Sequence, residues 1–108
     1  MTVNSVCEKL GLGVCNLADG EREVDGVYAG DLLSWVMGHA ECSNVLVTIM
    51  SNINTLAVAS LLDLSCVILS ESVKPDKEFA DTAKEKEINV FTSSLTTYEL
   101  CAKLSEIL

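Results

Sequence analysis

Three segments between Val45 and Leu69 decide the fold: Val45-Leu46-Val47-Thr48-Ile49, an alanine- and leucine-rich stretch from Thr55 to Leu64, and Cys66-Val67-Ile68-Leu69. The first and last are short, continuous apolar runs, which are typical of strands buried on both faces of a sheet. The longer stretch between them predicts a helix. Because a strand, a helix and a strand in this order form the repeating unit of a parallel sheet, the centre of the chain predicts an α/β fold.

The same alternation continues to the end of the chain. Pro75-Asp76 opens a charged amphipathic segment that predicts a helix to about Glu87, and Ile88-Asn89-Val90-Phe91 predicts a third strand. Ser94 is the expected N-cap of a last helix that carries Leu95 and Ile107. This half therefore predicts a small three-layer α/β/α domain with a mostly parallel sheet and helices on its faces.

Upstream of Val45 the elements are shorter, and glycines mark their ends. Helices are expected from Thr2 to Leu10 and from Asp31, as N-cap, to Gly38, and strands from Leu12 to Leu17 and from Val24 to Ala29. Asn52 and Asn54 are the expected turn and cap residues before the central helix. No linker divides the 108 residues, so we expect one domain spanning residues 1–108.

The charge of the chain excludes several classes of partner. With 16 acidic and 7 basic residues the formal net charge is -9, and no cluster of lysine and arginine exists to bind phosphate backbones. Binding to nucleic acid and electrostatic docking on anionic membranes are therefore not expected. No apolar stretch is long enough to cross a bilayer and no signal-peptide pattern begins the chain, which predicts a cytoplasmic protein.

The cysteines indicate a reducing compartment rather than a metal site. The five of them, an odd number without a close pair, do not have the short ligand spacing of metal sites. We therefore expect no bound metal and no cofactor. Cys66 begins a buried strand and is expected to be an inert core thiol.

Residues for catalysis are also missing. The chain has no glycine-rich phosphate loop with lysine, and its one histidine, His39, is expected to be solvated in a polar loop. Asp31 and Glu71 would form a carboxylate pair only if folding brought them together. Trp35 is expected to pack in the core or at an interface. These observations predict that the protein is not an enzyme.

The candidate ligand site lies where the predicted parallel strands end. In such sheets ligands bind beyond the carboxyl ends of the strands, between loops and helix N-termini whose N–H groups suit an anion. Each of three such loops, Met50–Asn54, Ser70–Lys74 and Thr92–Ser94, is rich in hydroxyl or amide side chains. The candidate ligand-binding residues are Asp31, Ser51, Asn52, Asn54, Ser70, Glu71, Thr92 and Ser93. The alternative is that they are ordinary capping and turn residues.

The segment from about Val24 to Leu104 resembles the DRTGG domain, an α/β module found beside nucleotide-binding CBS domains in some pyrophosphatases. The whole chain is also similar to the N-terminal domain of HPr kinase/phosphorylase, whose fold is similar to that of certain Mur ligases. The residues that carry the resemblance are Val24–Leu33, Val47–Asn54, Ala57–Leu61, Val67–Leu69, Pro75-Asp76 and Val90–Ser93.

The motif that names the family is changed in this chain. Where an Asp-Arg pair is expected after the central strand, the chain has Ser51-Asn52-Ile53-Asn54, and where Thr-Gly-Gly is expected it has Ser70-Glu71-Ser72. The resemblance, together with the polar loops and the high apolar content, favours a non-catalytic regulatory module that senses a small metabolite or nucleotide at the strand ends. A homodimer is expected because a parallel sheet in so short a chain leaves an edge or a helix face to be covered. The alternative is a protein-interaction subunit that binds a protein partner and has no small-molecule site.

Overall fold

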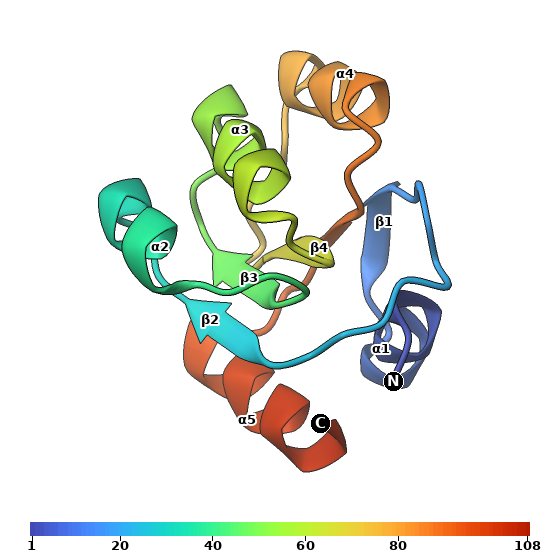
Figure 1. Cartoon of the computed structure of the whole chain (residues 1–108). Coiled ribbons are helices and arrows are strands. Elements are labelled where there is room, and N and C mark those ends of the chain that lie inside the picture. The colour runs from blue at the N-terminus through green and yellow to red at the C-terminus, as the bar shows by residue number, and fades with distance from the viewer.

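The computed structural model describes residues 1–108 and confirms the α/β alternation (Figure 1). The strands are β1 (Gly13–Asn16), β2 (Val27–Ala29), β3 (Val45–Thr48), β4 (Cys66–Leu69) and β5 (Val90–Thr92). The helices are α1 (Val3–Leu10), α2 (Leu33–His39), α3 (Ile53–Leu62), α4 (Lys77–Glu85) and α5 (Thr97–Ile107). The strands form one sheet in the order β1-β5-β4-β3-β2.

The sheet is parallel from β2 to β5, and β1 is the antiparallel exception at one edge. Val45 of β3 pairs with Val27 of β2 and Cys66 of β4, and Val67 of β4 pairs with Val90 of β5. Every residue of β3 and β4 is fully buried, as the continuous apolar runs predicted. The prediction of a mostly parallel sheet is therefore confirmed.

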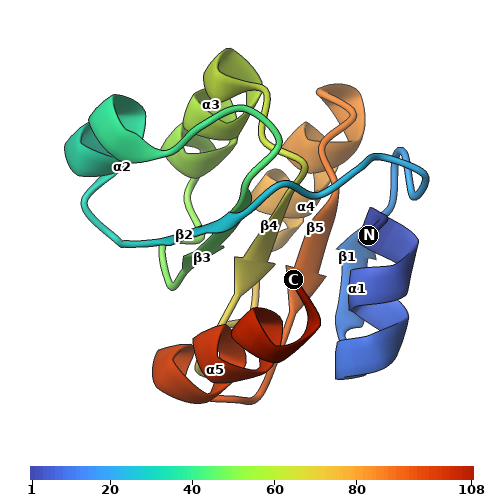
Figure 2. The same cartoon turned by 60° about the horizontal axis from the view of Figure 1, so that its bottom comes forward.

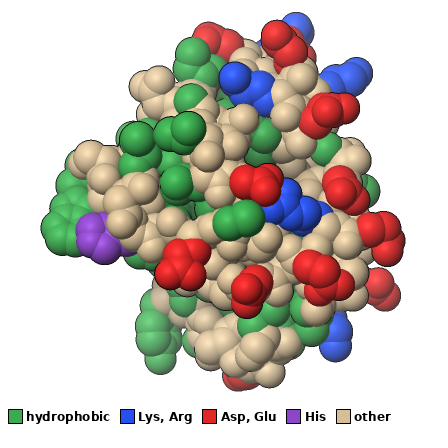
Figure 3. Space-filling view, in the orientation of Figure 1, with side chains coloured by type: hydrophobic (Ala, Val, Ile, Leu, Met, Phe, Trp, Pro, Cys, Tyr) green, Lys and Arg blue, Asp and Glu red, His purple; other side chains and the backbone are tan.

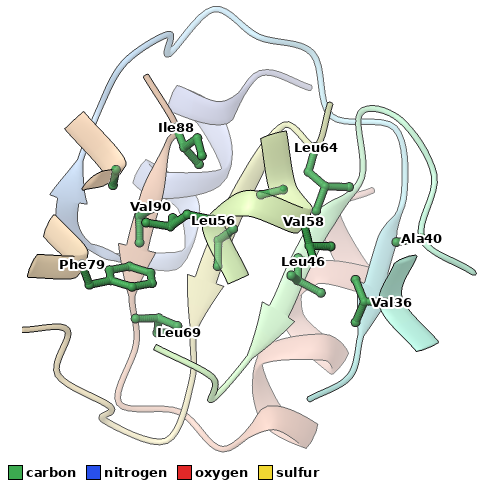
Figure 4. Close-up of a cluster of buried hydrophobic side chains, with 13 residues drawn as sticks. Val36, Ala40, Leu46, Leu56, Val58, Leu64, Leu69, Phe79, Ile88 and Val90 are labelled. Atoms are coloured by element: carbon green, nitrogen blue, oxygen red, sulfur yellow. The ribbon is translucent and has the colours of Figure 1, made fainter. Parts of the chain in front are cut away.

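Helices α2, α3 and α4 cover one face of the sheet (Figure 1). The strands contribute Leu46, Val67, Leu69 and Val90 to this side, and Phe79 of α4 is the largest side chain packed against them (Figure 4). These residues alternate along the strands with those that face the other side, which is the period of a pleated sheet. The three helices that connect β2, β3, β4 and β5 thus form one layer.

Helices α1 and α5 form the other layer (Figure 2). Strand residues Val45, Val47, Cys66, Ile68 and Phe91 pack here against Val3, Val6, Leu100 and Leu104 of the two helices. The three-layer α/β/α arrangement is therefore confirmed. None of the five helices has the length and apolar character that a membrane crossing requires.

Three helices begin at the residues that the sequence indicated, and two begin elsewhere. The side chains of Thr2, Asn52 and Asp76 cap α1, α3 and α4 by accepting backbone N–H bonds. The prediction of Asp31 as a cap is wrong, because α2 has Leu32 at its N-cap without a side-chain bond. The prediction of Ser94 is also wrong: α5 begins at Thr96, where a capping box with Glu99 satisfies two backbone donors.

The end of α2 also differs from the prediction. Gly38 lies inside the helix and His39 is its last residue, so His39 is exposed as expected but is not in a loop. Its ring stacks on that of Trp35, with centroids 4.4 Å apart. Trp35 is 56% exposed and is therefore not a core residue. Cys66 is fully buried, and burial raises the pKa of its thiol to about 12, which confirms an inert core cysteine.

Candidate ligand pocket at the carboxyl ends of the strands

The topology brings five segments to one edge of the sheet. Because β2 to β5 are parallel, the connections that follow them all begin at the same edge. Strand β1 runs in the opposite direction, so its first residue, Gly13, pairs with Thr92 at the carboxyl end of β5. The start of β1 therefore joins the four strand-end connections.

Asp31, at the β2 end of this edge, has a structural role. One of its carboxylate oxygens, Oδ1, accepts hydrogen bonds from Thr48 Oγ1 and from the Ile49 backbone N–H, both at 2.9 Å. The same Thr48 hydroxyl oxygen accepts a bond from the Met50 N–H. Asp31 therefore fastens the connection after β2 to the end of β3.

The connection after β3 forms only a shallow groove. Asn52 Oδ1 accepts a hydrogen bond from the Asn54 N–H at 2.9 Å, which is the cap of α3, while the side chains of Ser51 and Asn54 make no hydrogen bond within the chain. Ser51 and Asn52 line a groove of about 140 Å³ together with Asp76 and Glu78. Two carboxylates in so small a space make this groove unsuitable for an anion.

Ser70 and Glu71 are bonded to the start of α5. The buried Ser70 hydroxyl lies 2.7 Å from the hydroxyl of Thr97, and a carboxylate oxygen of Glu71 accepts the Thr97 N–H at 2.9 Å. The capping box occupies the N–H groups of Thr96 and Glu99. The chain's own side chains therefore use most of the free donors that the α5 N-terminus was expected to offer a ligand, and Asp31 and Glu71 serve different elements.

The turn after β4 explains the glycines expected in the family motif. Glu71 and Ser72 both have left-handed backbones, with φ of 62° and 60°, and the Val73 N–H donates to the Ser70 carbonyl. Two consecutive positive φ values define a type I′ turn, which glycine adopts most easily. In this chain the turn is held by bonds from Glu71 N to Leu95 O and from Ser72 N to Ser93 O.

The largest pocket of the molecule, about 780 Å³, lies where this turn meets β5 and β1. Its walls come from the end of α1, the start of β1, the connections after β4 and β5, and the sides of α4 and α5. The lining residues are Leu10, Gly11, Gly13, Val14, Cys15, Ser72, Val73, Lys74, Pro75, Ala80, Thr92, Ser93, Ser94, Leu95 and Lys103. The volume is in the range of pockets that bind small molecules.

The structure thus divides the candidate residues between two places. Thr92 and Ser93 line the large pocket, whereas Ser51 and Asn52 line the shallow groove. Asp31, Asn54, Ser70 and Glu71 line neither. Five of the eight side chains make hydrogen bonds that hold loops and helix ends, namely Asp31, Asn52, Ser70, Glu71 and Ser93.

Free polar groups remain in the large pocket. The hydroxyls of Ser72, Thr92 and Ser94 make no hydrogen bond within the chain, and Ser93 Oγ accepts one from the Leu95 N–H. Lys74 and Lys103 take part in none of the salt bridges. Cys15 is the one cysteine in the wall, and burial raises the pKa of its thiol, so it is protonated at neutral pH.

Sequence reasoning missed two contributors to this pocket, Gly13 and Lys103. A Cβ on Gly13 would lie 2.5 Å from Thr92 Oγ1, so any other residue here would force the Thr92 hydroxyl to move out of its position beside β1. The rule for strand ends covers parallel strands only, and β1 enters this edge because it is antiparallel. Lys103 is on α5, well beyond any strand-end loop, so no local signal in the sequence places it here.

Comparison with known proteins gives solved structures of similar fold and one family. No curated protein matches the chain. A crystal structure of the CBS and DRTGG domains of the regulatory region of Clostridium perfringens pyrophosphatase, complexed with its activator diadenosine tetraphosphate, is similar with a TM-score of 0.71. The identity is 15%, so the similarity is one of fold, and the match covers 94% of this chain and 44% of that one. The family model of the HPr Serine kinase N terminus matches residues 36–108, more than half of the chain, and the chain therefore belongs to this family.

Proposed function

We propose that this chain is a non-catalytic regulatory module that senses a small metabolite or nucleotide at the carboxyl-terminal edge of its sheet. The observation that carries the proposal is the pocket of about 780 Å³ beside β5 and β1, with its unbonded hydroxyls. Support also comes from the solved structure of the same fold, which belongs to a regulatory region and holds a nucleotide activator. Residues 1–108 act in this proposal as one unit.

The side chains in the pocket favour binding over catalysis. No histidine and no carboxylate lines it, so the bases that most often activate a serine or threonine nucleophile are missing from the pocket. Cys15 is protonated because burial raises its pKa, and a thiol is a poor nucleophile. Hydroxyls and lysines beside apolar side chains suit recognition of a ligand.

A thermal-shift screen tests the sensing role. It uses adenine and guanine nucleotides, dinucleotide cofactors, UDP-sugars, diadenosine tetraphosphate and the neutral nucleosides. A ligand at a hundred times its dissociation constant adds about 2.7 kcal/mol to stability, which for a domain of this size is a shift of roughly ten degrees or more.

Two variants locate the response. Thr92→Val replaces the pocket hydroxyl of Thr92 with a methyl group of similar size, and we expect it to reduce the ligand-induced shift in melting temperature. Asn52→Ser keeps a capping side chain on α3 in the shallow groove, and we expect it to leave the shift unchanged. A response lost in Asn52→Ser but retained in Thr92→Val would move the site to the groove and contradict the proposal.

The proposal includes a homodimer, because large apolar side chains are exposed around α2. Five large apolar side chains are each more than 40% exposed: Leu32 at the N-cap of α2, Trp35 and Met37 on α2, Ile49 after β3, and Ile53 at the start of α3. In Figure 3 hydrophobic side chains gather beside His39 at this side of the molecule. Light scattering at micromolar concentration tests it: we expect a dimer that Trp35→Ser converts to a monomer, and a monomeric wild-type chain would remove the claim.

The same surface favours a second candidate function, a protein-interaction subunit without a small-molecule site. Exposed apolar patches of this kind are typical of protein contacts. In that case the ligand screen gives no shift with any compound, the chain alone is monomeric, and Trp35→Ser abolishes capture of the partner.

A further inference from the structure

The large pocket differs from the rest of the molecule in its charge. The chain has 16 acidic and 7 basic residues, so carboxylates dominate its surface. Among the 15 residues that line the pocket there are two lysines, Lys74 and Lys103, and no aspartate or glutamate. The largest cavity of an acidic protein is therefore free of acidic side chains and carries two positive charges.

The two lysines reach the pocket from different elements. Lys74 follows the type I′ turn after β4 and precedes α4, whereas Lys103 is on α5, which covers the opposite face of the sheet (Figure 2). The hydroxyl groups of Thr92, Ser93 and Ser94, at the end of β5, join the two sides. A ligand in the pocket therefore meets hydroxyl donors, one cation from the connection between β4 and α4, and one from α5.

The fold itself does not need these charges in the pocket. Arg22 and Lys77 form salt bridges with Asp63 and Asp81, but neither pocket lysine has a carboxylate within salt-bridge distance. Two acidic residues, Glu99 and Glu106, lie within one turn of Lys103 along α5, and neither forms a salt bridge with it. The Glu99 carboxylate accepts the Thr96 N–H at 3.0 Å. Since Glu99 is bound to the helix start and Glu106 forms no salt bridge with Lys103, the ammonium group of Lys103 remains available for an anion from solution.

The pocket also has an apolar wall. Leu10, Val14, Val73 and Leu95 line it, and Val14 is 58% exposed although it belongs to a strand of the sheet. Exposed aliphatic side chains next to cations and hydroxyls suit a ligand with a flat or apolar part beside a charged part.

We infer that the ligand of this pocket is a phosphorylated small molecule with an apolar ring, the chemistry of a nucleotide, whose phosphate lies between Lys74 and Lys103. This inference rests on the proposed sensing function and specifies its ligand class. The hydroxyls of Ser72, Thr92 and Ser94 donate to the phosphate oxygens, and the ring lies on the aliphatic wall. Lysine and hydroxyl donors to phosphate are charge-assisted bonds, which are stronger than bonds between neutral groups.

The test compares matched ligands and matched lysines by calorimetric titration of the full chain. Adenosine, AMP, ATP and diadenosine tetraphosphate differ in phosphate while they share the ring. Lys74→Gln and Lys103→Gln remove one pocket charge each, and Lys84→Gln is the control, because Lys84 is an exposed lysine of α4 that lies outside the pocket and forms no salt bridge.

We expect phosphorylated ligands to bind at least tenfold more tightly than adenosine, and each pocket substitution to weaken them by roughly tenfold. Lys84→Gln is expected to change nothing, and raised salt is expected to weaken AMP but not adenosine. All three lysines are exposed, so thermal unfolding of the variants serves as the check that they fold.

Two results overturn the inference in different ways. Binding of adenosine as tight as that of AMP, unaffected by the pocket lysines, rejects the phosphate and leaves the sensing function standing. Equal weakening by Lys84→Gln and the pocket substitutions rejects a defined site. Binding of no compound, charged or neutral, rejects the inference together with the proposed function.

Discussion

Polar residues lie at both ends of the carboxyl-terminal edge of the sheet, but they have different roles at the two ends. At the β2–β3 end, the side chains of Asp31 and Asn52 accept hydrogen bonds from within the chain. The exposed side chains around them are largely apolar, among them Trp35 and Ile49. At the β5–β1 end, hydroxyls and two lysines remain unbonded around a pocket of about 780 Å³.

The difference arises from the partner strand at each end. Strand β2 is parallel to β3, and helix α2 follows it and closes that end. Strand β1 is antiparallel to β5, and it brings a glycine rather than a helix to the end of β5. Polar residues at strand ends are thus structural where a helix packs on them, and they are free for a ligand where an antiparallel edge leaves a hollow.

Of the substitutions that test this contrast, removal of the Asp31 carboxylate is expected to change stability the most. Asp31→Ala leaves the Ile49 N–H and the hydroxyl of the fully buried Thr48 without their acceptor, and we expect a loss of about 2 kcal/mol in unfolding free energy. Asp25→Ala is the matched control, because the Asp25 carboxylate makes no hydrogen bond. Chemical denaturation measures both. A stable Asp31→Ala protein with an altered ligand response would mean that Asp31 belongs to the ligand site.

Adding one methyl group tests the two ends with opposite signs. Gly13→Ala brings a Cβ against Thr92 Oγ1, and we expect about 1–2 kcal/mol of destabilisation, relieved when Thr92→Ala is added. Gly38→Ala in α2 meets no atom within 4 Å and is expected to stabilise the fold by about 1 kcal/mol. Thermal and urea unfolding of the single and double variants give the coupling; independent effects at Gly13 and Thr92 would contradict the close approach of β1.

The turn after β4, where Glu71 and Ser72 have left-handed backbones, is expected to give smaller stability changes, again of opposite sign for two matched substitutions. Ser72→Gly removes the cost of a left-handed backbone at a serine and is expected to stabilise the fold by about 0.5–1 kcal/mol. Ser34→Gly, on the exposed surface of α2, is expected to destabilise it by a similar amount, because glycine weakens a helix. Urea midpoints decide the signs. Equal signs would show that the turn is not strained by its side chains.

The sequence was most informative where a pattern is local. The buried strands β3 and β4 and the caps Thr2, Asn52 and Asp76 follow from the order of apolar and capping residues alone. The cap of α5 also has a local signal, since Thr96 and Glu99 have the spacing of a capping box, and this signal identifies the helix start better than Ser94 does.

What the sequence could not predict depends on contacts between distant segments. A short apolar strand such as β1 has the same local pattern whether it pairs parallel or antiparallel, and this choice creates the pocket. Lys103 reaches the pocket only because α5 packs on the face of the sheet opposite to α4, and the bond from Thr48 to Asp31 joins residues 17 positions apart. Tertiary packing, not composition, separated the bonded polar residues from the free ones.

The smallest expected effect is a change in the pH dependence of stability, caused by Glu99 at the N-terminus of α5. The Thr96 N–H, the Thr96 hydroxyl and, to a lesser degree, the charge of Lys103 lower the pKa of Glu99 below its ordinary value. A carboxylate with a lowered pKa stabilises the fold above its unfolded pKa and loses that contribution as pH falls through its folded pKa. Glu99→Gln keeps the capping geometry without this titration.

We therefore expect Glu99→Gln to be slightly less stable than the wild type at neutral pH and equal to it once the wild-type carboxylate is protonated. Glu41→Gln, beyond the end of α2, is the control, since the Glu41 carboxylate accepts no hydrogen bond and its substitution is expected to change stability less at neutral pH. Urea midpoints across acidic pH measure the difference. Because Glu99 is an acidic neighbour of Lys103, four positions before it on α5, the same variant is also expected to bind AMP slightly more tightly. Unchanged or weaker binding would contradict a contact between Lys103 and the phosphate.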